Sequence, residues 1–150
     1  MDLSQFKHQF KVKVQFHEVD LLGVCNNAIY FNFFETARLD YLKAIKQYRE
    51  MEDILNSPKF YLMVHNECDY YEPAYYDDEL IIYTRIKYVK NSSFGFEHIV
   101  VKCSSGSIIA KGNAVIVRID RVSKKSIPLS DDFYTSVANF EGNVERINRN

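Results

Sequence analysis

The chain contains no tryptophan and has little proline, glycine or cysteine, with three Pro, five Gly and three Cys among 150 residues. The scarcity of Pro and Gly, beside eleven Phe and eleven Tyr, is typical of a folded domain and excludes a disordered chain. Cys25, Cys68 and Cys103 lie far apart without a CxxC motif, which argues against a disulfide framework and a structural zinc site. We therefore expect a reducing, cytoplasmic environment.

A strong charge of either sign is also absent. Nineteen Lys and Arg against twenty Asp and Glu leave a net charge of −1, so no global field attracts nucleic acid or an anionic membrane. Nowhere do eighteen apolar residues follow one another, and the first residues lack the apolar region of a signal peptide. We expect a soluble protein with no nucleic-acid partner and no stable membrane insertion.

The length suits a single domain with a sizeable core. Residues 28–46 contain no Pro or Gly, and their apolar residues cover more than one stripe, which predicts a helix enclosed by the rest of the fold. The polar positions that leave it a narrow wet face are Asn32, Thr36, Lys43 and, as a further candidate, Arg38. For residues 47–57 the sequence predicts either a short second helix or an irregular segment, which ends before Pro58.

Alternating apolar and polar residues predict strands over 10–16 and over about 61–71, 79–90, 93–103 and 107–119. In the first, Phe10, Val12, Val14 and Phe16 share one side. Turn-forming residues separate the later segments. One strand, an enclosed helix and four sequential strands indicate an α+β fold in which an antiparallel sheet curls around a long central helix. Residues 140–150 carry little apolar content and are expected to fray.

A polar turn runs directly into this helix in residues 16–38, FHEVDLLGVCNNAIYFNFFETAR. The turn contains Asp20, Gly23, Asn26 and Asn27. It therefore brings a carboxylate close to backbone N–H groups that have no partner within the helix. Such a helix start suits a developing oxyanion.

This segment resembles the signature of the hotdog-fold thioesterases of the 4-hydroxybenzoyl-CoA thioesterase and YbgC type. The matching positions are Phe16, Asp20, Gly23, Asn26, Asn27, Ala28, Tyr30, Glu35, Ala37 and Arg38. A second stretch, residues 66–86, looks like a strand, turn and strand of the same family, so the resemblance covers about residues 10–134. It implies a single hotdog domain over residues 1–150, with about five strands around the helix, and an acyl-CoA thioesterase.

The resemblance gives Asp20 the role of catalytic carboxylate, either as nucleophile on the thioester carbonyl or as general base for water. The alternative is that Asp20 only stabilises the turn. Asn26 and Asn27 replace a His pair found in many members of the family. Asn27 is the candidate for orienting water or the carbonyl, or else caps the helix. Asn26 and Tyr30 are expected to contact the substrate.

Two neighbouring residues have more ordinary interpretations. Glu18 could share a side with Asp20 in an extended segment, but a structural or tuning role is favoured. Cys25 lies one residue before the Asn pair, yet no His is placed to form a Cys-His dyad, so catalysis by this thiol is not expected. The four histidines of the chain show no metal-ligand spacing, and no metal site is predicted.

The phosphates of coenzyme A need cations and N–H donors. The turn after the strand expected over 79–90 supplies Lys90, Asn91 and Ser93. The corresponding turn of the resembled family binds the nucleotide. A second basic run comprises Arg118, Arg121, Lys124 and Lys125. Either run can instead be a solvated loop. No cofactor is implied beyond the coenzyme A of the substrate.

The resemblance further implies a homodimer with active sites at the subunit interface, commonly paired into a homotetramer, because a small curled sheet leaves strand edges to be covered. Two other functions stay open. One is hydrolysis of acyl-carrier-protein thioesters, in which a protein surface replaces much of the nucleotide contact. The other is a non-catalytic protein that binds acyl-CoA with the same fold.

Overall fold

The computed structural model describes residues 2–47 and 55–147. Its long strands are β1 (His8–Lys13), β2 (Lys59–Tyr70), β3 (Glu79–Val89), β4 (Ser93–Lys102) and β5 (Ile108–Asp120). Helix α1 spans Ile29–Ala44, and helix α3 spans Asp131–Glu141. Short elements complete the fold: the 3-10 helices η1 (Leu3–Gln5) and η2 (Phe16–Glu18), and strand β6 (Glu145–Arg146).

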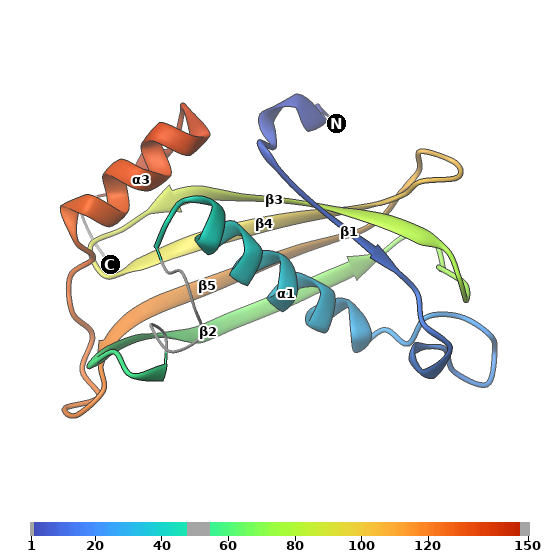
Figure 1. Ribbon diagram of the computed structural model, residues 1–150, viewed down its shortest axis with the longest axis horizontal. Coiled ribbons are helices and arrows are strands. Elements are labelled where there is room, and N and C mark those ends of the chain that lie inside the picture. Colours follow the sequence, from blue (N-terminus) through green and yellow to red (C-terminus); the bar gives the residue numbers. More distant parts are fainter. Residues whose placement is uncertain (1, 48–54, 148–150) are drawn as a thin grey trace.

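The long strands form one antiparallel sheet in the order β1-β3-β4-β5-β2, and β6 adds to β3 in parallel. Helix α1 lies along one face of this sheet, and α3 lies at the end where β3 finishes (Figure 1). This is the predicted α+β hotdog fold, with the four later strands within two residues of their expected bounds. The strand missing from the expected set is the two-residue β6.

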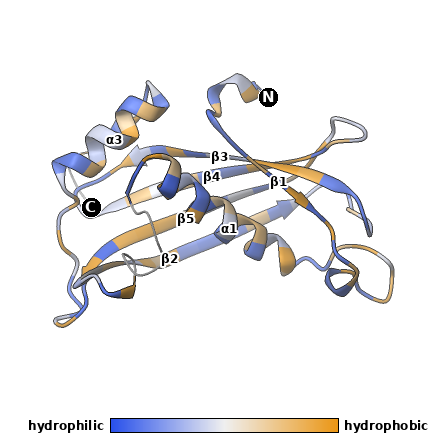
Figure 2. Cartoon of the chain, in the orientation of Figure 1, coloured by the Kyte–Doolittle hydropathy of each residue, from blue (hydrophilic) through white to orange (hydrophobic). Residues whose placement is uncertain are grey.

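The inner face of the sheet packs against α1 through large side chains. Tyr30, Phe34 and Tyr41 of α1 are all buried and belong to two apolar clusters that together span the length of the helix. The edge strand β2 differs: Figure 2 shows hydrophilic residues over its second half, in contrast to the apolar stretches of the neighbouring strand β5. The sheet therefore has a well-packed centre and an edge strand, β2, whose second half is polar.

A row of cross-strand partners crosses the sheet beneath the middle of α1. His8 pairs with Thr84, Thr84 with His98, and His98 with Gly112. The ring of Phe34 stacks on His98 with centroids 4.5 Å apart. A Cβ atom at Gly112 would lie 2.4 Å from the same phenyl ring, so the absence of a side chain there lets α1 approach the sheet.

The start of the chain corrects one expectation. Strand β1 ends at Lys13 rather than at residue 16, and Phe16 begins η2, where it is 77% exposed and packs edge-on against Tyr76. The cause is local, because Gln15 and Glu18 form a capping box that starts the 3-10 turn. The alternation of the strand therefore stops before it reaches Phe16.

The end of the chain corrects a second. Residues 140–147 do not fray, since α3 continues to Glu141 and β6 pairs with the end of β3. Glu141 is buried, and its Oε2 accepts hydrogen bonds from the Tyr41 hydroxyl, at 2.5 Å, and from the backbone N–H of Ile86. The helix or excursion expected over 47–57 lies largely outside the described residues. In the described part of the chain, no helix is long and apolar enough to cross a membrane.

Candidate active site

The residues between η2 and α1 form a tight hairpin. Val19 and Cys25 pair as an isolated antiparallel bridge, and the Asp20 N–H donates to the Val24 carbonyl at 2.9 Å. Gly23, at φ +81°, takes the left-handed conformation that the turn requires, and its N–H donates to the Asp20 carbonyl. The sequence therefore fixes Asp20 at the base of a short loop that leads directly into the helix.

The Asp20 carboxylate is exposed, and its Oδ1 accepts a hydrogen bond from the N–H of Leu22 at 2.8 Å. It thus stabilises the turn, which was the alternative to catalysis, and this contact leaves the group accessible to a reactant. Nearby, burial raises the pKa of the Cys25 thiol to about 12, and the Glu18 and Asp20 charges add to the effect. Cys25 is therefore a poor nucleophile near neutral pH.

Glu18 has a structural task, as its Oε1 accepts the N–H of Gln15 at 2.7 Å. This contact closes the capping box of η2. The side chain is therefore held to the backbone on the N-terminal side of the hairpin, which agrees with the structural role favoured from the sequence.

The two amide side chains before helix α1, Asn26 and Asn27, have different surroundings. Asn26 Oδ1 accepts the N–H of Ala28 at 3.0 Å, and the Asn26 carbonyl accepts the N–H of Ile29 at 2.9 Å. The N-cap residue of α1 is Ala28, which makes no side-chain cap, and Asn26 fixes the turn before it, so the cap considered for Asn27 is not formed. The side chain of Asn27 is exposed and lines a cleft.

This cleft has a volume of about 240 Å³ and lies between the helix start and the segment after β2. Its lining residues are Val24, Cys25, Asn27, Tyr30, Tyr70, Tyr71, Glu72 and Pro73. Tyr30 is almost fully buried and forms its inner wall. Asp20 does not line the cleft, but Val24 and Cys25 of the same hairpin do, so the carboxylate flanks it.

Tyr70 is a cleft residue that the sequence reasoning missed. Its hydroxyl donates to the Asn27 carbonyl at 2.6 Å, and its ring meets Tyr30 edge-on at 5.1 Å. Burial, followed by the contact with Cys68, raises the pKa of Tyr70 to about 12, so this donor keeps its proton. The sequence did hold a signal for Tyr70, namely the alternation of side chains along β2. This alternation places Tyr70 on the same face as Asn66 and Cys68.

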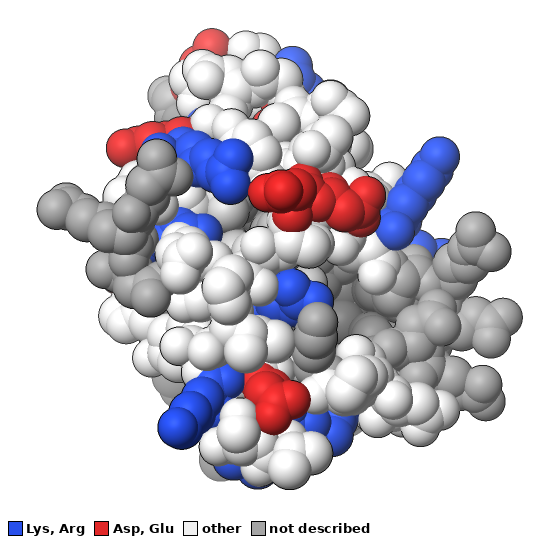
Figure 3. Space-filling view, turned by 90° about the vertical axis from the view of Figure 1, so that its left-hand side faces the viewer, with Lys and Arg blue, Asp and Glu red and all other residues white. Residues whose placement is uncertain are grey.

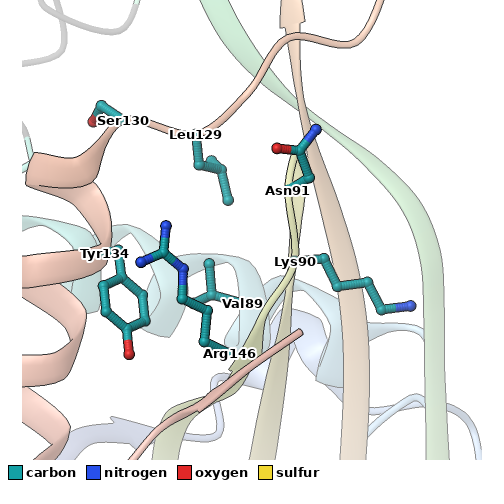
Figure 4. Close-up of a pocket in the computed structure, with 7 residues that line it drawn as sticks. All are labelled: Val89, Lys90, Asn91, Leu129, Ser130, Tyr134 and Arg146. Carbon is teal, nitrogen blue, oxygen red and sulfur yellow. The ribbon is translucent and has the colours of Figure 1, made fainter. Parts of the chain in front are cut away.

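The turn between β3 and β4 lies at the other end of the sheet. Lys90 N–H donates to the Ser93 carbonyl at 2.7 Å, and the Asn91 carbonyl accepts from Leu129. Ser93 is buried. Lys90 and Asn91 line a cavity of about 100 Å³ that α3 and Arg146 help to close. Figure 4 shows the Lys90 side chain extending away from Tyr134.

Charges at this end are mixed. Arg146 lies over the Tyr134 ring at 4.2 Å and 3.8 Å from an oxygen of Asp131. Figure 3 shows blue and red side chains interspersed over this end of the molecule rather than one continuous basic surface. An anion here would be held by individual side chains and N–H groups.

The two sets of predicted site residues are far apart in one chain. The Asp20 hairpin contacts Tyr75, just before β3 begins, whereas Lys90 follows directly after β3 ends. Eleven residues of β3 span about 35 Å at ~3.3 Å per residue. The structure thus brings together Asp20, Asn26, Asn27 and Tyr30, and separately Lys90, Asn91 and Ser93.

The family of the chain follows from its sequence over most of this fold. A model of the thioesterase-like superfamily matches residues 14–137. The chain belongs to this superfamily. It is a thioester hydrolase, and the matched residues contain both the Asp20 hairpin and the Lys90 turn.

Individual relatives agree with this membership. The chain is similar to the uncharacterized protein YsmA of Bacillus subtilis, with 28% identity over 136 residues and 88% of each chain covered. It is 26% identical to the acyl-CoA thioesterase YbgC of Haemophilus influenzae, over 79% of this chain and 85% of that protein. A solved thioesterase of Thermus thermophilus, complexed with coenzyme A and Zn, is 27% identical with a TM-score of 0.79, covering 93% of this chain and 97% of the other.

The geometry at the start of α1 is suited to thioester chemistry. A thioesterase must supply a nucleophile or a base, together with donors for the negative charge that develops on the carbonyl oxygen. Asp20 offers an accessible carboxylate. The N-terminal end of α1 offers a partial positive charge and backbone N–H groups.

Proposed function

We propose that this thioesterase hydrolyses acyl-CoA at the start of α1, with Asp20 as the carboxylate that acts on the thioester. The observation that carries this proposal is the exposed Asp20 carboxylate, held by its turn beside the cleft at the helix start. Asp20 either attacks the carbonyl carbon or takes a proton from the attacking water. The chemistry requires no metal ion or other cofactor, because the carboxylate supplies the nucleophile or the base.

The backbone around Asn27 polarises the thioester carbonyl in this proposal. The Ala28 N–H is engaged by Asn26 Oδ1, and the Tyr30 N–H reaches the Asn27 carbonyl only at 3.4 Å. The Asn27 N–H, which has no acceptor among the described residues, is the donor left for an oxyanion. The Asn27 side chain orients water or the carbonyl, while Asn26 holds the helix start and Tyr30 forms the wall of the substrate cleft.

The coenzyme A portion is bound by Lys90, Asn91 and Ser93. Lys90 carries the cation for a phosphate and Asn91 an amide, while the buried Ser93 acts by holding the turn, since its carbonyl accepts the Lys90 N–H. The names of the YbgC relative and of the coenzyme A complex from Thermus support coenzyme A as the carrier. The separation of this turn from Asp20 means that one chain does not bring the two ends of the substrate together.

A second copy of the chain resolves that separation. The edge strand β2 presents exposed apolar residues, Tyr61, Leu62, Val64 and Tyr70, and its outer edge is open to pairing. Antiparallel pairing of β2 with the same strand of a second copy would place the Lys90 end of one chain beside the Asp20 end of the other. We therefore infer a homodimer with two shared sites, and pairing of such dimers into a homotetramer.

Hydrolysis of an acyl-carrier-protein thioester is the second candidate. The chain is 24% identical to the acyl-acyl carrier protein thioesterase ATL3 of Arabidopsis thaliana, over 79% of this chain and 60% of that protein. In this case a carrier-protein surface would replace part of the nucleotide contact at Lys90. The same Asp20 chemistry would apply.

The test is thiol release from a panel of acyl-CoA esters, from acetyl to palmitoyl with benzoyl and phenylacetyl, by wild type and Asp20→Asn. We expect turnover of at least one ester and a loss of about a hundredfold or more in kcat for Asp20→Asn. Asp132→Asn, which removes an exposed carboxylate at the far end of the molecule, should leave kcat unchanged. Equal activity of wild type and Asp20→Asn would contradict the assignment, and cleavage of carrier-protein esters alone would select the second candidate.

A further inference from the structure

A second cavity lies between α1 and the inner face of strands β2, β4 and β5, away from the cleft at the helix start. Its volume is about 300 Å³, within the size range of small-molecule pockets. Most of its wall is apolar or aromatic, with Leu42 from α1, Met63 from β2 and Phe96 from β4 as examples. The exceptions are two residues of α1, Glu35 and Arg38.

Arg38 is only 6% exposed, and its Nη1 has no hydrogen-bond partner among the described residues. The sequence pattern made Arg38 a candidate for the wet face of the helix, and the structure corrects this. Burial lowers the pKa of Arg38 to about 10, so the guanidinium still carries its charge at neutral pH. A buried donor without a partner is costly and uncommon in folded proteins.

Among the described residues, Glu35 is the carboxylate whose charge favours the charged form of Arg38. Glu35, one turn earlier, is exposed, and its charge is therefore screened by water. The carboxylate of Asp40 is 2.7 Å from His8 Nε2. His98 is fully buried, and desolvation together with the charges of Arg38 and His8 lowers its pKa, which favours a neutral imidazole. The wall of this apolar cavity thus contains a cation whose Nη1 has no partner in the part of the chain that the structure describes.

We propose that this cavity receives the far part of the acyl group, and that Arg38 selects acyl chains bearing an oxygen acceptor at that end. An apolar chain matches the wall, and a terminal carboxylate or hydroxyl oxygen gives Arg38 the partner it lacks. A carboxylate fits best because it also balances the buried charge. The inference rests on the proposed function, since it names the class of acyl group that the thioesterase hydrolyses.

The first test compares three CoA esters of the same chain length: octanoyl-CoA, 8-hydroxyoctanoyl-CoA and the mono-CoA ester of octanedioic acid. For wild type, kcat/KM should be at least about tenfold higher for the dicarboxylic ester than for octanoyl-CoA, with the hydroxy ester between them. Arg38→Met should reduce this ratio at least about tenfold, and Arg38→Lys less. Lys43→Met, which removes an exposed cation from the same helix, should leave the ratio unchanged.

The second test needs no catalysis. Calorimetric titration should show octanoate binding to wild type at least about tenfold more tightly than 1-octanol, with the preference lost in Arg38→Met. If no CoA ester is cleaved but this preference is found, the proposed function fails and the Arg38 pocket stands. Equal binding of the two probes, or a preference that survives Arg38→Met, overturns the inference. So does an Arg38→Met protein that loses its dimer in sedimentation while the substrate ratio is unchanged, because Arg38 would then serve the interface.

Discussion

The two ends of the sheet are built for different tasks. At the Asp20 end, the carboxylate and the Asn27 amide are exposed at a helix start, where they cost the fold little. At the Lys90 end, α3 covers the turn, Ser92 and Ser93 are buried, and only individual side chains reach solvent. In the proposed function, the carboxylate and the coenzyme A contacts lie at opposite ends of one chain, and we therefore propose that the complete site combines two chains.

After that of Asp20→Asn, the largest effect is expected from removing the Asn27 side chain. Asn27→Ala should lower kcat about 10- to 100-fold, because it removes a group that orients water or the carbonyl, and should leave the midpoint of thermal unfolding nearly unchanged. Asn26→Ala is the matched control, since it removes the acceptor of the Ala28 N–H at the helix start and should lower the free energy of unfolding by about 1 kcal/mol. Steady-state kinetics and thermal unfolding of both variants make the measurement. The reverse pattern would contradict the roles assigned to the two amides.

Between the two ends of the sheet lies the buried core, which contains His98. The protonation of this residue makes the stability of the core depend on pH. Its pKa is lowered by burial and by the Arg38 and His8 charges, so the unfolded chain binds a proton at His98 that the folded chain does not. Keeping His98 neutral therefore costs the folded protein nothing above the ordinary pKa of about 6.5. Below that pH the free energy of unfolding falls.

The expected result is a free energy of unfolding that falls more steeply with acid in wild type than in His98→Phe. Between pH 6.5 and 5.5 the extra loss should be about 1 kcal/mol. Phe is the chosen replacement because Phe34 and Phe96 already stack on this ring. Denaturant unfolding at several pH values measures the difference. Parallel pH profiles for the two proteins would show that His98 is accessible to protons in the folded state.

At the other end, Lys90→Ala should raise KM about fivefold, equivalent to ~1 kcal/mol for one exposed phosphate contact, with kcat retained. Lys124→Ala tests the second basic run, and we expect its KM to equal that of wild type. Initial rates over a range of acyl-CoA concentrations distinguish the two. A larger effect from Lys124→Ala would move the nucleotide site to the turn after β5.

The smallest effect is expected at the start of helix α3, which covers the Lys90 turn. The Ser130 hydroxyl accepts the N–H of Phe133 at 3.1 Å and caps α3. Ser130→Ala should lower the free energy of unfolding by about 1 kcal/mol, and Ser130→Asp, which keeps an acceptor, should retain most of it. Chemical denaturation measures both. A fall in kcat without loss of stability would instead assign α3 a part in the chemistry.

Much of the fold could be predicted because its signals are local. The alternation in β3 and the absence of Pro and Gly in α1 placed both elements within two residues of their observed bounds. Helix α3 was missed, although Ser130 before two Asp residues is a helix-start signal and Phe133, Val137 and Phe140 repeat at helical spacing. The low apolar content of the last residues outweighed that signal.

The site could be predicted only in part, for a physical reason. Asp20 and Asn27 stand close together in the sequence, so a motif could indicate them. Tyr70 reaches Asn27 from another strand, and Arg38 is buried only because β2, β4 and β5 close around it. Such contacts depend on how distant segments pack, which single-sequence periodicity does not encode.

The central claim is that each active site combines the Asp20 end of one chain with the Lys90 end of its partner. The most direct test is a mixed dimer of one Asp20→Asn chain and one Lys90→Glu chain, purified through two different affinity tags. We expect one intact site per dimer, formed by the unchanged Asp20 of one chain and the unchanged Lys90 of the other. The activity should be about half of that of the wild type. Activity no higher than that of the Lys90→Glu chain alone would show that each site belongs to a single chain.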